Sequence, residues 1–224
     1  MFDPGNQVMG EEYKTHLLEI LYVRSFQYDP EGKFKLVSGR TSDVYIDAKK
    51  TTLSAEAMEL IGYSLFQELK LEPIDGIGGL TLGADPIAYA AALVSTMHGK
   101  GLDAFVVRKE PKKHGTMKWI EGNLKPGATV CIVEDVATTG ESAITAVLRA
   151  REEGLQVRCV IALVDRQEGA YENILAKTGL RLFALHTKAE LLDMHKKIKE
   201  AEDAEKGRKT RSSARQIPEG TPDF

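Results

Sequence analysis

The chain has 224 residues with ordinary proportions of apolar and charged side chains, enough for one domain with a sizeable core. Its formal net charge of −3 argues against a global basic field for nucleic acid or a membrane surface. No stretch approaches the ~20 apolar residues of a spanning helix. The chain does not start with a basic region followed by an apolar one, so we expect a cytoplasmic protein with no membrane partner.

In chain order, the first predicted elements are an amphipathic helix over residues 11–26, two short strands, and a helix that Ser54 caps. Strands and helices then alternate until a capping box, Thr187 with Glu190, opens a terminal helix. The strands are predicted at 76–79, 104–107, 130–133, 157–164 and 180–185, and the helices at 86–97, 141–153 and 170–177. This alternation predicts an α/β fold with a central, mostly parallel sheet flanked by helices and a ligand site at the strands' carboxyl ends.

Two features lie outside this pattern. Cys131 and Cys159 fall in apolar runs and are interpreted as buried, reduced thiols. A disulfide or metal pair is the weaker alternative, because no further ligand stands at a suitable spacing. Residues 201–224 are polar and partly basic, and we expect a mobile tail there rather than a contact with nucleic acid or a partner.

The most informative stretch covers residues 130–142. An apolar run ends in two adjacent carboxylates, Glu134 and Asp135, and a turn rich in hydroxyls leads into a helix. Such a loop points free backbone N–H groups and the helix dipole at one spot, which favours a phosphate. The acids could accept hydrogen bonds from sugar hydroxyls, so a sugar phosphate satisfies both halves. The alternative is an ordinary strand and helix cap, which rarely carries two adjacent carboxylates without a partner for them.

A second stretch, residues 108–116, follows a predicted strand and is rich in cations. Arg108 comes directly after the strand, where it would point at the site, and Gly115 and Gly122 suit a mobile lid. A solvated charge run is the alternative. A basic lid fits a reaction in which pyrophosphate leaves, because Lys and Arg stabilise the negative charge that develops on it.

The first stretch resembles, in order and spacing, the phosphoribosyl-pyrophosphate (PRPP) signature of type I phosphoribosyltransferases. The second resembles the catalytic loop of orotate phosphoribosyltransferases. Residues 34–47 are similar to the family's amino-terminal segment that closes over orotate, and residues 78–86 to its pyrophosphate loop. Arg166 follows a predicted strand, where the family binds the orotate carboxylate.

The resemblance implies the type I phosphoribosyltransferase fold over residues 1–200, with a hood segment at about 1–50, a core at about 51–200 and a mobile catalytic loop. It implies transfer of ribose 5-phosphate from PRPP to orotate, a homodimer with shared active sites, and Mg2+ held mainly through PRPP rather than by protein ligands.

The resemblance also implies roles for individual residues. Lys109, Lys112, His114 and Asp135 would be catalytic. Thr138 and Arg166 would hold orotate. The implied PRPP-binding residues are Arg108, Lys109, Lys112, His114, Glu134, Asp135, Val136, Ala137, Thr138, Thr139, Gly140, Glu141 and Ser142.

Two positions depart from the family pattern. Val37 and Leu82 stand where relatives can carry lysine, and Arg40, Lys49 or Lys113 could compensate. Two other functions compete with orotate transfer: transfer to another base, and a PRPP-binding regulator without catalysis. Arg166 favours an acidic base such as orotate, because a neutral base needs no cation. The basic run favours catalysis over regulation.

Overall fold

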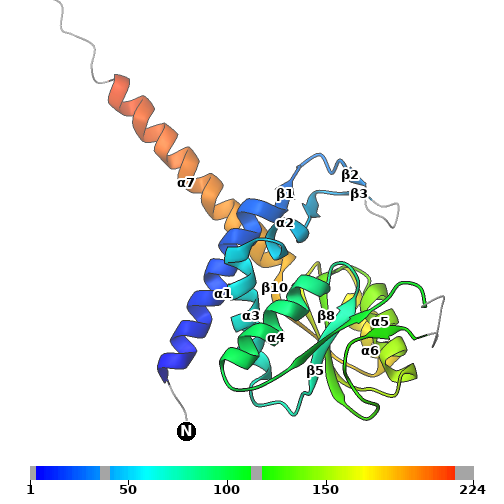
Figure 1. Cartoon of the computed structure of the whole chain (residues 1–224). Coiled ribbons are helices and arrows are strands. Elements are labelled where there is room, and N and C mark those ends of the chain that lie inside the picture. Colours follow the sequence, from blue (N-terminus) through cyan, green and yellow to red (C-terminus); the bar gives the residue numbers. More distant parts are fainter. Residues whose placement is uncertain (1–3, 36–40, 112–117, 215–224) are drawn as a thin grey trace, which may run out of the picture.

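A six-stranded sheet forms the centre of the computed structural model, which describes residues 4–35, 41–111 and 118–214, with only the backbone for 4–9 and 207–214 (Figure 1). The strand order is β10-β9-β8-β5-β6-β7, and all neighbours are parallel except β6 and β7. The strands are β5 (Gly76–Leu80), β6 (Asp103–Val107), β7 (Ile120–Glu121), β8 (Thr129–Ala137), β9 (Gln156–Asp165) and β10 (Leu182–Thr187). The predicted α/β class is therefore confirmed.

Helices cover both faces of this sheet. The helices packed around it are α3 (Ala55–Leu69), α4 (Asp85–Met97), α5 (Glu141–Glu152) and α6 (Ala170–Thr178). Along β8, Cys131 and Val133 join the core beneath α3 and α4, whereas Val130 and Ile132 join the core beneath α5 and α6. This period of two means that every central strand is buried on both sides, which explains its continuous apolar sequence.

The amino-terminal segment begins with α1 (Pro4–Ser25), which packs along α3 (Figure 1). A small hood follows, and its elements are β1 (Phe26–Tyr28), β2 (Phe34–Lys35), β3 (Thr41–Ser42), β4 (Val44–Ile46) and α2 (Lys49–Thr52). The strands pair antiparallel, β1 with β4 and β2 with β3. Strand β1 was not predicted, because its three residues continue directly from α1 without a turn signal. Val37 and Arg40 lie outside the described residues.

The last helix, α7 (Lys188–Ala214), projects away from the domain (Figure 1). The Thr187 amide and hydroxyl both donate to Glu190, and the Glu190 amide donates to the Thr187 hydroxyl, which confirms the predicted capping box. The helix continues through the polar segment that begins near Ala201 as far as Ala214, and the rest of the expected tail lies outside the described residues. Ion pairs three residues apart support this exposed helix, such as Lys199 with Glu202.

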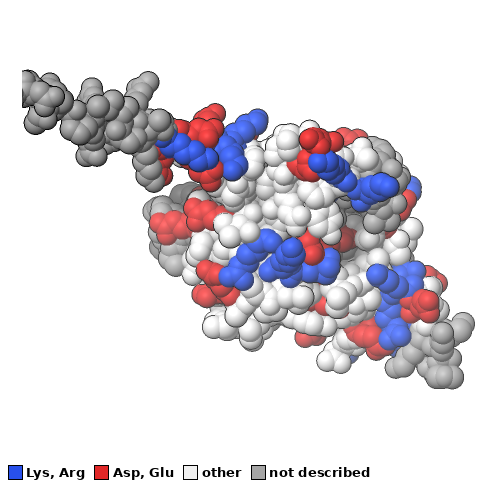
Figure 2. Space-filling model, turned by 90° about the horizontal axis from the view of Figure 1, so that it is seen from above, with Lys and Arg blue, Asp and Glu red and all other residues white. Residues whose placement is uncertain are grey.

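Charges of both signs are interspersed over the face that Figure 2 shows. None of the helices in the described ranges is both long enough and apolar enough to cross a membrane.

His186 in β10 is a buried titratable group, with 2% of its surface exposed. Among the described residues, neither ring nitrogen has a hydrogen-bond partner, and Glu190 stands 3.9 Å from Nδ1. Burial lowers the pKa of His186 to about 4, which Lys14 assists and Glu190 opposes. In the unfolded chain this pKa returns to about 6.5. Protons therefore bind the unfolded chain preferentially as the pH falls from 6.5 towards 4, and the folded state loses stability over that window.

We predict that the free energy of unfolding falls by about 2 kcal/mol between pH 7.5 and pH 5 through His186 alone. Urea unfolding at both pH values would measure it. A His186→Leu variant should lose this part of the pH dependence, whereas a variant of the exposed His16, His16→Leu, should keep it. Equal pH dependence in wild type and His186→Leu would contradict this assignment.

Candidate active site

The turn between β8 and α5 lies at the carboxyl edge of the sheet. Gly140 has a φ of +81°, and a Cβ there would approach the Ile174 side chain to 2.8 Å, so both backbone and packing require glycine. Asn173 of α6 anchors the turn by donating to the Thr139 carbonyl at 2.9 Å. No described side chain caps α5, so the amides of its first turn remain available to an anion.

The two adjacent acids of β8 point to opposite faces of the sheet, as successive strand residues do. Asp135 lies towards the α4 side, where its Oδ1 accepts from the Val136 amide at 2.8 Å. Glu134 is buried, and its Oε2 has no hydrogen-bond partner among the described residues. Burial, assisted by the neighbouring Asp135, raises the pKa of Glu134 well above its usual value, while the positive charge of Lys109 opposes this. The two carboxylates therefore differ in environment although they are adjacent in sequence.

The loop between β5 and α4 packs directly against Asp135. A Cβ on Gly83 would lie 2.6 Å from the Asp135 carboxyl carbon, so only glycine allows this approach. Thr81 stiffens the loop by donating to Asp85 at 2.7 Å, and its peptide bond to Leu82 is cis. Burial raises the pKa of Asp85, and the bond from Thr81 opposes that rise. Two loops that the sequence analysis treated as separate motifs are thus in contact.

A pocket of 460 Å³ lies between the hood, the turn from β8 into α5 and Arg166 after β9. Several predicted site residues line it together: Asp135, Val136, Thr138, Thr139, Glu141 and Arg166. The hood contributes Lys35, Tyr45, Ile46, Ala48 and Lys49. The aromatic rings of Phe34 and Tyr45 stack with their centroids 5.7 Å apart. The pocket therefore offers apolar and aromatic surface on one side and polar groups on the other.

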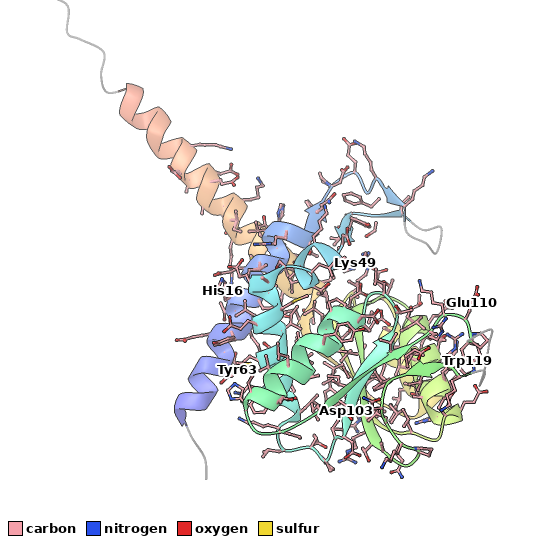
Figure 3. The ribbon with its side chains drawn as sticks, in the orientation of Figure 1. His16, Lys49, Tyr63, Asp103, Glu110 and Trp119 are labelled. Carbon is pink, nitrogen blue, oxygen red and sulfur yellow. The ribbon has the colours of Figure 1, made fainter. Side chains whose placement is uncertain are left out.

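Lys49 supplies a positive charge to this pocket (Figure 3). It pairs with Asp47 at 3.2 Å. Burial acts to lower the pKa of Lys49, but Asp47 and then Asp135 outweigh it, so that the pKa is raised and the ammonium group stays charged. From the sequence, Lys49 is expected only as a possible substitute for the lysines that relatives can carry at positions 37 and 82. Nothing in the local pattern at the start of α2 indicates that it lies near Asp135.

Arg166 forms a buried junction between β9, the hood and α7. It is 3% exposed and donates to Glu168 at 2.9 and 3.2 Å, to the Ser42 hydroxyl at 3.2 Å and to the Val44 carbonyl at 3.3 Å. Glu168 also pairs with Lys188 at 3.2 Å. Burial acts to raise the pKa of Glu168, but Arg166 and Lys188 outweigh it and lower that pKa. The guanidinium group is therefore held in one position at the pocket wall.

Comparisons with known proteins agree with this geometry. No family model matches the chain. An orotate phosphoribosyltransferase of Aquifex aeolicus is 49% identical over 80% of this chain and 97% of its own length. The chain belongs to the orotate phosphoribosyltransferase family.

Solved structures of this family are also similar. The Mycobacterium tuberculosis orotate phosphoribosyltransferase in complex with Fe(III) dicitrate matches with a TM-score of 0.69 and 40% identity, over 80% of this chain and 98% of that one. The structure of the same enzyme in complex with PRPP matches with a TM-score of 0.65 and 38% identity over the same shares. The fold predicted from the motifs is therefore that of the orotate phosphoribosyltransferases.

Arg108 and Lys109 line a second cavity of 460 Å³, which lies beside the β5–α4 loop. Arg108 pairs with Glu121 at 3.1 Å, and Arg149 stacks over the Trp119 ring at 4.0 Å (Figure 3 labels Trp119 and Glu110). The predicted residues Lys112 and His114 lie outside the described residues. Within the described parts of the chain, no group of three or more His, Cys, Asp or Glu side chains could hold a metal ion.

We predict that Gly83→Ala lowers kcat/KM for PRPP by ~10²-fold, because the added methyl group would displace the Asp135 carboxylate by a fraction of an ångström or more. Initial rates and the thermal midpoint of both proteins would measure this. Gly101→Ala is the matched control, since its Cβ would meet nothing within 4 Å. Wild-type rates in Gly83→Ala would show that the contact with Asp135 is not needed.

Proposed function

We propose that this chain transfers ribose 5-phosphate from PRPP to orotate in the cytoplasm, giving orotidine 5′-monophosphate and pyrophosphate, a step of de novo pyrimidine synthesis. One observation carries the proposal: Asp135, the turn into α5 and Arg166 line one pocket, and the β5–α4 loop closes against Asp135. A sugar phosphate with an acidic base needs all of these groups at once.

In this proposal, the turn over residues 136–142 binds the 5′-phosphate through backbone amides and hydroxyls at the amino end of α5. Glu134 and Asp135 accept hydrogen bonds from the ribose 2′- and 3′-hydroxyls. The position of Asp135 at the pocket wall supports this role. Glu134 does not line this pocket; it is buried on the opposite face of the sheet, and its Oε2 has no hydrogen-bond partner among the described residues.

The chain's own residues would act mainly by positioning and by electrostatics. As pyrophosphate leaves, the ribose carbon gains positive character, which the acids near the ribose favour, and orotate attacks with inversion at that carbon. Arg108 and Lys109, together with the predicted Lys112 and His114, would stabilise the departing anion. Bound Mg2+ would supply further charge neutralisation to the pyrophosphate oxygens. The carboxylate and hydroxyl oxygens that line the pocket, such as those of Asp135 and Thr138, suit a hard cation that reaches the site bound to PRPP.

Arg166, with Thr138, would hold orotate. Arg166 donates these bonds through its Nε and Nη2 atoms, and within the described residues Nη1 has no hydrogen-bond partner. An orotate carboxylate could pair with Nη1 without breaking the junction to Glu168. A type I transferase for another base remains the second candidate, and it would leave the fixed positive charge of Arg166 without a use.

A homodimer would complete the site. Apolar side chains of α4 are exposed at Leu93 and Met97, by 64% and 75%, beside a groove of 680 Å³ with mainly apolar walls. Tyr89 lines both this groove and the cavity that holds Arg108 and Lys109. A second copy seated on the groove would therefore reach the edge of the basic cavity, as shared active sites require.

The reaction itself is tested by the loss of orotate's ultraviolet absorbance with PRPP and Mg2+, beside parallel assays with adenine, hypoxanthine and uracil. Loss with orotate that stops when Mg2+ is chelated would support the proposal. Turnover with another base would refute the assignment of Arg166. Thermal protection by PRPP without turnover would indicate a regulator instead.

We predict that Arg166→Gln raises the KM for orotate roughly 10- to 100-fold, as expected for one lost hydrogen-bonded charge, with a much smaller change in the KM for PRPP. Steady-state kinetics with each substrate varied in turn would measure this. Arg181→Gln serves as the control and should leave both values unchanged, because Arg181 is an exposed arginine directly before β10. Equal increases for both substrates would contradict base recognition by Arg166.

We predict that Leu93→Asp yields a monomer with little activity, because it places a charge in the apolar groove. Sedimentation and initial rates would measure this, with Leu148→Asp on α5 as the control, since Leu148 is also half-exposed. An active monomer would refute the shared site.

The sharing of sites has a second test. We predict that neither His114→Ala nor Asp135→Asn is active alone. If each site takes His114 from one subunit and Asp135 from the other, a mixed dimer of the two variants contains one intact site. Random reassociation makes half of the dimers mixed, so the mixture should regain about a quarter of the wild-type activity. Mixtures that stay inactive while exchanging subunits would mean that each site is built from one chain.

A further inference from the structure

The two cysteines lie side by side on neighbouring parallel strands. Cys131 of β8 and Cys159 of β9 are register partners, and a β-bulge between Val130 and Cys131 leaves Arg158 as the extra residue of β9. Both side chains belong to the core beneath α3. Neighbouring strands lie about 4.8 Å apart, and a disulfide needs a Cα–Cα distance of about 4.4–6.8 Å. The spacing of the two strands is therefore compatible with a disulfide between the two sulfur atoms.

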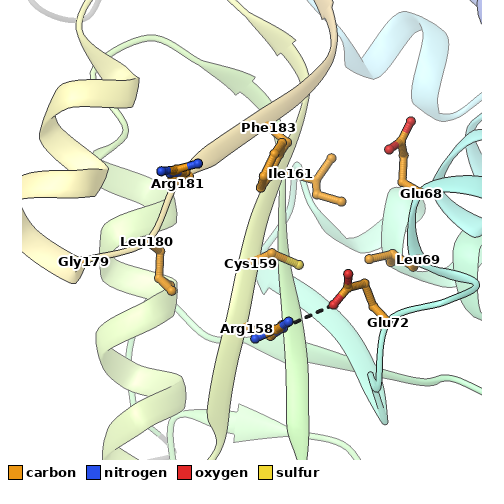
Figure 4. A pocket seen from close by; sticks show the side chains of 10 residues that line it. All are labelled: Glu68, Leu69, Glu72, Arg158, Cys159, Ile161, Gly179, Leu180, Arg181 and Phe183. Carbon is orange, nitrogen blue, oxygen red and sulfur yellow. Dashed lines mark hydrogen bonds and ion pairs between the residues drawn. The ribbon is translucent and has the colours of Figure 1, made fainter.

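A pocket of 570 Å³ gives solvent access to one of the two thiols (Figure 4). It lies at the amino ends of the strands, opposite to the candidate active site. Cys159 lines it together with Ile161 and Phe183, and Arg158, Glu72 and Arg181 carry charge around it. Cys131 is fully buried behind Cys159. An oxidant of small size can therefore reach Cys159 directly but can reach Cys131 only through it.

The charges around the pair distinguish the two sulfur atoms. The Cys131 thiol donates to the Ile132 carbonyl at 3.6 Å. The interaction between the two neighbouring thiols lowers the pKa of Cys159 and, with burial, raises the pKa of Cys131 well above its usual value. Burial and Glu72 oppose the lowering at Cys159, and Arg158 favours it. Arg158 is itself paired with Glu72 at 3.2 Å. Cys159 therefore ionises more readily than Cys131, and the thiolate is the reactive form of a cysteine.

We propose that Cys159 and Cys131 form an oxidation site for hydroperoxides, in which Cys159 reacts first and Cys131 resolves the product into a disulfide. The Cys159 sulfur attacks the distal oxygen of a hydroperoxide, the O–O bond breaks, and Cys159 becomes a sulfenic acid while the other oxygen leaves as water or an alcohol. The Cys131 sulfur then attacks the Cys159 sulfur, the S–O bond breaks, and the thiol proton leaves with the hydroxyl as water. In sum, two thiols and one hydroperoxide give one disulfide and two molecules of water, or one of water and one of alcohol.

This site does not depend on the transferase reaction. Its closest link to the transferase is strand β8, which carries Cys131 at one end and Glu134 and Asp135 nearer the other. A disulfide would fasten β8 to β9 below the acids, and a thiol reductant would release it. The pair thus has the two properties of a reversible oxidation site, an accessible first thiol and an adjacent resolving thiol.

The test treats the full-length folded chain with stoichiometric hydrogen peroxide, alkylates it without reductant and maps it by mass spectrometry. We expect a mass lower by two hydrogen atoms, a Cys131–Cys159 linked peptide and reversal by dithiothreitol. This measurement uses only the wild-type chain, so it holds even where a variant fails to fold. Disulfides between chains, peroxide products without the linked peptide, or thiols inert until unfolding would overturn the proposal.

Two variants test the order of reaction. Cys131→Ser should accumulate a sulfenic acid on Cys159 that dimedone traps, whereas in Cys159→Ser the Cys131 thiol should react at least ~10-fold more slowly than Cys159 does in wild type. Both variants in urea, where each thiol is exposed, serve as controls and should react at similar rates. Trapping on Cys131 at the wild-type rate of Cys159 would overturn the assigned order.

Discussion

The close approach of Gly83 to the carboxylate of Asp135 sets how near the two loops of the site can lie to each other. One loop follows β5 and the other follows β8, and both leave the sheet at its carboxyl edge. The strands themselves also approach closely before these loops begin. A Cβ on Gly79 of β5 would lie 2.1 Å from the Val133 carbonyl oxygen of β8. Neighbouring parallel strands bring these loops together, but only glycine allows them to touch. The position of the acid relative to the leaving-group loop is thus a consequence of packing in the sheet.

A second constraint fixes the hood above this edge. Arg166 is buried, and an unpaired buried charge would be costly, so its bonds to Ser42, Val44 and Glu168 stabilise the junction of the hood in addition to orienting the guanidinium group. These bonds join three segments that are distant in sequence. The same junction ties the pocket wall to α7 through Lys188. The residue proposed to select the acceptor base is therefore also a structural anchor, which explains why so little of its surface is exposed.

Much of the architecture could be predicted from the sequence because apolar periodicity, glycine turns and capping boxes are local signals. The predicted strand at 130–133 was too short, however, since β8 continues to Ala137 and pairs with β9 at Glu134, Val136 and Ala137. Backbone hydrogen bonds to β9 extend β8 beyond the apolar run at 130–133, from which the strand was predicted. The length of α7 was also missed, because a polar sequence without an apolar stripe can still form a helix stabilised by charged pairs.

The contacts of the site were less predictable than its residues. The motifs named Asp135, Thr138 and Arg166, which share one pocket, but no local pattern shows that Lys49 lies beside Asp135 or that Glu168 holds Arg166. Such contacts arise from the packing of distant segments. They also set the charges of the site, since the different environments of Glu134 and Asp135 follow from the opposite directions of successive strand residues.

The most direct test of this account is a crystal structure of the chain with PRPP, Mg2+ and orotate. The account predicts the 5′-phosphate on the turn over residues 136–142, the ribose hydroxyls at Asp135, the pyrophosphate against the loop containing Gly83, and the orotate carboxylate at Nη1 of Arg166. A PRPP molecule bound away from the carboxyl edge of β8, or orotate bound without contact to Arg166, would contradict it.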